Sequence, residues 1–132
     1  MRKAFTGLAM LLMLAVVAQF FLAASGAFDP APVDESFRPH RALGYGIVLF
    51  ALVLTIVAAI ARMPGRLIGM TGLVAGLAAV QGVISAIAKA FGDTGGPIVF
   101  GLHAVNALVI VAVIRTVIQQ ARALPVSAVP VS

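Results

Sequence analysis

The sequence predicts an all-α integral membrane protein, an antiparallel up-and-down bundle of four helices. Of its 132 residues, 62% are hydrophobic and 10% are charged, which is too few charges for the water-facing surface of a soluble domain. Because the charge-free runs show no barrel-like alternation, helices are the expected spanning elements. Each of the four runs is long enough to cross about 30 Å of hydrocarbon as a helix, and together they cover 4–28, 42–61, 67–88 and 94–114.

The first helix is expected over residues 4–24. Its basic start, apolar stretch and following small residues are also typical of a secretory signal peptide. A retained helix is favoured because the apolar stretch is longer than a usual signal core. The prolines and acids of residues 25–39 then predict a surface link rather than a folded unit.

The second helix is expected over residues 40–61, with Ser36 as its N-cap and Pro39 in its first turn. Pro64 and Gly65 predict a tight turn to a third helix over 67–89.

The fourth helix is expected over residues 97–120, with Pro97 in its first turn after a glycine-rich link. Residues 1–124 thus form one transmembrane domain, and the proline-interrupted residues 125–132 are expected to be a flexible tail. No internal repeat of 20 to 50 residues is evident.

The net charge of +5 points to the bilayer rather than to nucleic acid because of where the charges lie. The ends of the spans that would share one side of the membrane carry basic residues and no acid, namely Arg2, Lys3, Arg62, Arg66, Arg115 and Arg122. The opposite side carries all four acids, Asp29, Asp34, Glu35 and Asp93. The positive-inside rule therefore predicts a multi-pass protein of the cell membrane with both termini in the cytoplasm.

The strongly polar side chains inside the predicted spans all lie in the outer half of the membrane. They are Gln19, His40, Gln81, His103 and Asn106. Polar groups in hydrocarbon mark a functional site unless they simply bond between helices, which is the plainer interpretation for each residue alone. Two histidines at similar depth on separate helices favour the functional interpretation. Facing imidazoles of a helix bundle ligate haem iron from both sides.

The surroundings of His40 suit haem. Gly44 lies one turn further on the same helix face, where its missing side chain would leave room for a flat macrocycle. Arg38 and Arg41 could pair with the propionates, or could contact lipid headgroups instead. We therefore predict a haem b site whose metal ligands are His40 and His103 and whose other binding residues are Arg38, Arg41, Gly44 and Gln81.

Two segments, "PHRALGYGIVLFALVLTIVAA" and "VAGLAAVQGVISAIAKAFGDTGGPIVFGLHAVNALVIVAVI", resemble one half of the haem A synthase family. The matching residues, in order, are His40-Arg41, Gly44, Gln81-Gly82 and His103. The resemblance covers about 80 residues and implies a haem-holding four-helix bundle. It does not carry over the oxidation chemistry, because the family's glutamate before the first histidine and its outer-loop cysteine pair have no counterpart here.

Two functions are predicted from these residues. The first is a membrane haem b protein for electron transfer or haem handling, because iron with two histidine ligands is closed to substrate. The alternative is a cofactor-free accessory subunit of a larger membrane complex. The expected partners are the lipid bilayer and either another membrane protein or further copies of this chain.

Overall fold

The computed structural model describes residues 2–124 and consists of helices joined by short turns. The helices are α1 (Arg2–Phe28), α2 (Val33–Ser36), α3 (Arg38–Ile60), α4 (Gly65–Ala90) and α5 (Gly92–Ala123). All except α2 are long and apolar enough to cross a membrane. These helices confirm the predicted fold, and the chain is a multi-pass membrane protein. The predicted flexible tail, 125–132, lies outside the described residues.

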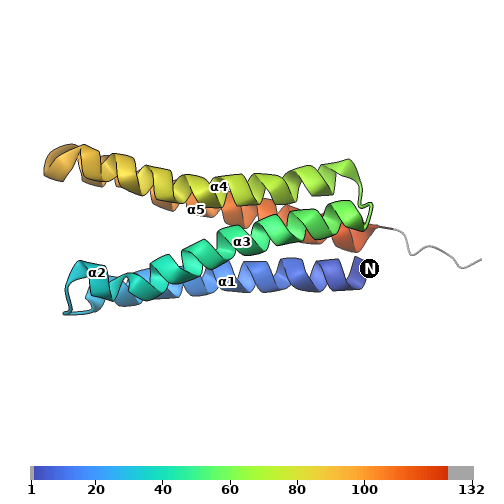
Figure 1. Ribbon diagram of the computed structural model, residues 1–132, viewed down its shortest axis with the longest axis horizontal. Coiled ribbons are helices and arrows are strands. Elements are labelled where there is room, and N and C mark those ends of the chain that lie inside the picture. Colours follow the sequence, from blue (N-terminus) through green and yellow to red (C-terminus); the bar gives the residue numbers. More distant parts are fainter. Residues whose placement is uncertain (1, 125–132) are drawn as a thin grey trace, which may run out of the picture.

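The four long helices alternate in direction and form a ring. Helix α1 packs beside α3 and α5, and α4 also packs beside α3 and α5. Consequently α1 stands diagonally opposite α4, and α3 diagonally opposite α5. Figure 1 shows that the start of α1, the α3–α4 turn and the end of α5 share one end of the bundle, here named the terminal end. The other end, which carries α2 and the α4–α5 junction, is named the α2 end.

The apolar core occupies the half of the bundle nearest the terminal end. The largest fully buried side chains all lie there, and they are Phe5, Leu12, Leu54, Leu67, Thr71, Val74, Ile114 and Val117. The hydroxyl of Thr71 donates to the carbonyls of Leu67 and Ile68, so its burial leaves no unpaired polar group. Towards the α2 end the α1–α3 and α4–α5 hairpins diverge (Figure 1). Apolar packing therefore holds the half of the bundle nearest the terminal end, while the other half contains Gln19, Gln81 and both histidines.

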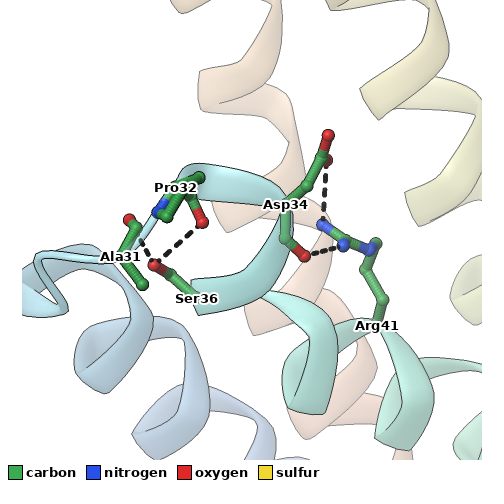
Figure 2. A network of polar contacts seen from close by, with 5 residues as sticks. All are labelled: Ala31, Pro32, Asp34, Ser36 and Arg41. Atoms are coloured by element: carbon green, nitrogen blue, oxygen red, sulfur yellow. Dashed lines mark hydrogen bonds and ion pairs between the residues drawn. The ribbon is translucent and has the colours of Figure 1, made fainter.

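The link between α1 and α3 is a surface link, as predicted, but it is shorter than expected and contains a helical turn. Helix α1 continues to Phe28, and residues 33–36 form α2. The expected cap was also wrong, because the Ser36 hydroxyl donates backwards to the carbonyls of Ala31 at 2.8 Å and Pro32 at 3.2 Å (Figure 2). Phe37 takes the N-cap position of α3 without a side-chain bond, and proline stands in the first turn as expected.

The α3–α4 turn closes with two backbone bonds. The Met63 N–H donates to the Ala58 carbonyl, and the Arg62 N–H donates to the Ala59 carbonyl. This pattern is the Schellman motif, whose left-handed position is usually glycine. Here Arg62 occupies it with φ 51°.

The α4–α5 junction has no loop, contrary to the prediction that the fourth helix begins near Pro97. Helix α5 begins at Gly92, so Pro97 lies inside it. The left-handed φ of Gly92, 63°, ends α4 and reverses the chain within one residue. Beside this junction Gly96 is buried so closely against α4 that a Cβ there would lie 2.6 Å from the Ala88 carbonyl oxygen.

Candidate functional site

Five amide and imidazole side chains, with at least one from each long helix, gather in the half of the bundle nearest the α2 end. All of them are half-buried, and they are Gln19 on α1, His40 on α3, Gln81 on α4, and His103 and Asn106 on α5. Each lies on the inward stripe of its helix. His40 continues the buried stripe of Ile47, Ala51, Leu54 and Ala58, and His103 continues that of Ile110, Ile114, Val117 and Ala121. The same helical periodicity that forms the core therefore aims the histidines into the bundle.

In the α1–α3 hairpin, Gln19 and His40 bond to each other's backbone. The Gln19 side-chain amide donates to the His40 carbonyl at 2.8 Å, and His40 Nδ1 lies 3.1 Å from the Gln19 carbonyl. Since a carbonyl can only accept, Nδ1 carries the proton in this contact and Nε2 of the neutral ring keeps a free lone pair. Metal-binding histidines are typically oriented by a hydrogen bond from the other ring nitrogen to a carbonyl, a carboxylate or water.

The structure gives Gly44 a neighbour that the sequence did not predict. A Cβ at this position would lie 3.0 Å from the Gln19 side-chain nitrogen. The space left by Gly44 is thus used by the amide that bonds to His40. Gln19, absent from the predicted site, belongs to it through this contact.

In the α4–α5 hairpin, Gln81 donates to the His103 carbonyl at 3.1 Å. One turn deeper, the Asn106 amide donates to the Leu77 carbonyl at 2.8 Å. His103 Nδ1 is buried without a hydrogen-bond partner. In the neutral tautomer with its proton on Nε2, this nitrogen is an available electron-pair donor.

The two histidines meet across the diagonal of the bundle. Their ring centroids are 6.2 Å apart, with 43° between the ring planes. Phe37 lies edge-on to His40 with centroids 6.0 Å apart, and Phe100 stacks on His103 at 4.9 Å. The structure therefore brings together the two predicted ligands and adds a phenylalanine to each, which the sequence had not singled out.

The two predicted arginines lie at the rim of this polar interior, and both are exposed. Arg41 donates to the Asp34 carbonyl and lies 3.7 Å from the Asp34 carboxylate (Figure 2). Exposed ion pairs contribute little to stability. The contact with Asp34 therefore orients the Arg41 guanidinium but leaves it free to bind another anion. Arg38 is one turn closer to the start of α3.

The residues present fit a metal held between two imidazoles. With metal–nitrogen bonds of about 2.0 Å, two rings on opposite sides of one ion have centroids about 6 Å apart, close to the observed 6.2 Å. Among residues 2–124 no cluster of three or more His, Cys, Asp or Glu side chains is placed to hold a metal ion. Two surface hollows, of about 520 and 200 Å³, lie along α1 and between α1 and α3, and neither is lined by a histidine.

Comparison with known proteins places most of this arrangement within one family. No curated protein and no solved structure matches the chain. Residues 19–88 match a family of unknown function, DUF6220. The matched region begins at Gln19 and includes His40 and Gln81, and it covers more than half of the 132 residues. The chain therefore belongs to the family of unknown function DUF6220.

Proposed function

We propose that the protein is an integral membrane haem b protein with His40 and His103 as axial ligands. The observation that carries this proposal is the meeting of two half-buried imidazoles from diagonal helices, with centroids 6.2 Å apart. The free lone pair of His40 Nε2 and the unpartnered nitrogen of His103 support it. The apolar walls around a polar interior suit a macrocycle with charged edges.

Several residues of the chain would assist this binding. The Gln19 carbonyl orients His40, and Arg38 and Arg41 at the rim offer charge-assisted hydrogen bonds to propionates. When bound, haem supplies one-electron chemistry. With both axial positions filled by histidine, the proposed roles are electron transfer or haem handling rather than oxygen chemistry.

We further propose that the protein lies in the cell membrane with the terminal end in the cytoplasm, on the basis of the basic residues gathered there. The site then faces outwards. One haem near one face cannot carry electrons across about 30 Å of hydrocarbon. A membrane quinol, another membrane protein or further copies of the chain would complete the path.

The test is an optical spectrum of the detergent-purified protein, expressed with ample haem and recorded before and after dithionite. The wild type should show a Soret band and the reduced bands of a six-coordinate b-type haem. His40→Ala and His103→Ala should each lose the six-coordinate spectrum, and the double variant should lose the haem. The control is Asn106→Leu, which removes a polar side chain from the same interior without removing an imidazole.

Two results would reject the proposal. A wild type without a Soret band would reject haem binding, and a double variant that retains haem with the wild-type spectrum would reject the ligand assignment.

The second candidate function is a cofactor-free accessory subunit, and one observation favours it. Gly69 and Gly76 lie on the exposed face of α4, and a Cβ at either position would meet nothing within 4 Å. Small residues at this spacing allow another helix to approach closely. Haem-free wild-type protein that co-purifies with a larger membrane complex would favour this candidate over the first.

A further inference from the structure

The polar residues of the two hairpins form matching sets. Gln19 bonds to the carbonyl of a histidine 21 residues later, and Gln81 bonds to the carbonyl of a histidine 22 residues later. In each hairpin a phenylalanine three residues before the histidine contacts its ring. Each glutamine also leaves its side-chain oxygen buried without a partner. The same short constellation thus occurs twice in one chain.

The buried core positions repeat in the same register. A shift of 62 residues takes buried positions of α1 onto buried positions of α4, pairing Phe5 with Leu67, Ala9 with Thr71, Leu12 with Val74, and Val16 with Ala78. A shift of 63 residues takes α3 onto α5, pairing Ile47 with Ile110, Ala51 with Ile114, Leu54 with Val117, and Ala58 with Ala121. The one-residue difference arises between the helices, where the connections differ in length. The period exceeds the range of 20 to 50 residues in which the sequence showed no repeat.

The packing has the symmetry that this repeat requires. A two-fold rotation about the long axis of the bundle would exchange α1 with α4 and α3 with α5. It would also exchange the α3–α4 interface with the α1–α5 interface. Both of these interfaces exist, while the diagonal helices have no Cα atoms within 8 Å of each other. His40 and His103 then stand on opposite sides of the axis, with their rings adjacent.

We propose that the bundle consists of two copies of one helical hairpin unit, and that Gln19 and Gln81 are equivalent positioning residues. Each holds its histidine-bearing helix at the histidine carbonyl, and together they present two imidazoles symmetrically about the pseudo-two-fold axis. The assignment of these imidazoles as haem ligands rests on the proposed function. The duplication and the two glutamine–histidine pairs do not.

The two hairpins differ at two positions next to the glutamine bonds. Both differences agree with Gln19 and Gln81 being equivalent positioning residues. The position equivalent to Gly44 is Ala107, whose methyl group occupies the place that Gly44 leaves to the Gln19 amide. The corresponding amide bond is longer, 3.1 Å against 2.8 Å. The position equivalent to Asn106 is Leu43, so the extra amide bond to Leu77 belongs to the α4–α5 hairpin alone.

The first test needs no haem. The chain has two histidines, so the carbethoxylation rate of each can be followed separately by mass spectrometry in the haem-free protein. Gln19→Met should speed the reaction of His40 by about 2- to 10-fold, the factor that one neutral hydrogen bond contributes to a local equilibrium. It should leave His103 unchanged, and Gln81→Met should do the reverse. Asn106→Leu, which removes a similar interhelical bond, should change neither rate.

A variant that changes the carbethoxylation rates of both histidines alike, or of neither, would overturn the paired assignment.

Should either glutamine variant fail to fold, the repeat is tested by Leu43→Asn, which copies Asn106 into the first hairpin. That variant should give a helical protein in wild-type yield, because its amide can reach the α1 carbonyl equivalent to that of Leu77. The matched control is Leu54→Asn, whose equivalent is Val117, and its yield should fall by about tenfold or more because its amide has no partner. Equal loss from both would overturn the repeat.

The second test uses the haem-loaded protein. Gln19→Met and Gln81→Met should shift the largest g-value of the low-spin ferric signal in the same direction and by similar amounts, while Asn106→Leu leaves it in place. A shift in one glutamine variant alone would overturn the equivalence. If no haem is bound, the proposed function fails, and the carbethoxylation rates still decide the glutamine–histidine pairs.

Discussion

At the residue scale, some glycines of this bundle let a group of a neighbouring helix approach closely. Gly44 admits the Gln19 amide, and Gly96 admits the Ala88 carbonyl of α4. The Ala88 contact is the tighter one, because a backbone oxygen cannot rotate away as a flexible side chain can. Near the α2 end, α4 and α5 can therefore lie as close together as they do because Gly96 has no side chain.

Gly96→Ala should lower the free energy of unfolding by about 1 to 3 kcal/mol, the usual cost of overpacking a closely packed site. Its Cβ would lie 2.6 Å from the Ala88 carbonyl oxygen, so α4 and α5 must move apart. Thermal unfolding in detergent, followed by helical circular dichroism, measures the change.

The matched control for this variant is Gly69→Ala, where an added Cβ meets nothing within 4 Å. Because alanine is the better helix former by about 0.5 to 1 kcal/mol, this variant should unfold at the same temperature as the wild type or higher. Equal destabilisation of both variants would contradict the close-approach argument.

The sequence predicted the two histidines and Gln81 as residues of the candidate site, but not Gln19, which bonds to the His40 carbonyl. The depth of His40 and His103 follows from counting residues along each helix, and both lie together in the structure. The contact of Gln19 with Gly44 depends on how α1 is rotated against α3. That rotation is set by packing along the whole hairpin, so local spacing could not reveal it.

At the element scale, the helix ends differ most from prediction, since several helices extend further than expected. Ser36 was predicted to be an N-cap and Pro97 to lie in a first turn, because serine and proline are common at these positions of helices. Ser36 instead closes the turn of α2, and Pro97 is inside a helix that Gly92 begins earlier. The span lengths were predictable from the charge-free runs because hydrocarbon thickness sets them. The junctions depend on individual backbone angles.

Gly92→Ala should lower the free energy of unfolding by about 1 to 2 kcal/mol, because a Cβ makes the left-handed conformation costly. The φ of Gly92 is 63°, and no atom would crowd the added methyl group, so the cost comes from the backbone alone. Chemical unfolding of the variant in detergent measures it. Gly92→Asn should lose less free energy of unfolding than Gly92→Ala, since asparagine tolerates this conformation better. A larger loss for Gly92→Asn than for Gly92→Ala would contradict the explanation.

At the scale of the whole molecule, the two halves of the bundle have different compositions. The half at the terminal end has the large buried side chains, and the half at the α2 end has Gln19, Gln81 and both histidines. The charges follow the same division along the sequence, with the acids confined to the α2 end. This division underlies the proposed orientation.

Single-cysteine labelling should confirm that orientation, because the chain contains no cysteine of its own. Asp29→Cys lies at the α2 end and Gly65→Cys in the turn at the terminal end, and both positions are exposed. A maleimide that cannot cross membranes should label Asp29→Cys on intact cells and Gly65→Cys only after permeabilisation. The opposite pattern would show that the positive-inside rule fails for this protein.

The rim of the site does not share the symmetry of its interior. In the α1–α3 hairpin the helix start carries Arg38 and Arg41, whereas the equivalent positions of α5 are Gly101 and Ala104. A flat ligand on a two-fold axis could enter in two orientations related by half a turn, with equal energy. Because these two arginines stand on one side only, a ligand with an anionic edge would adopt a single orientation, and its redox-active plane would present a defined face to any electron donor in the membrane.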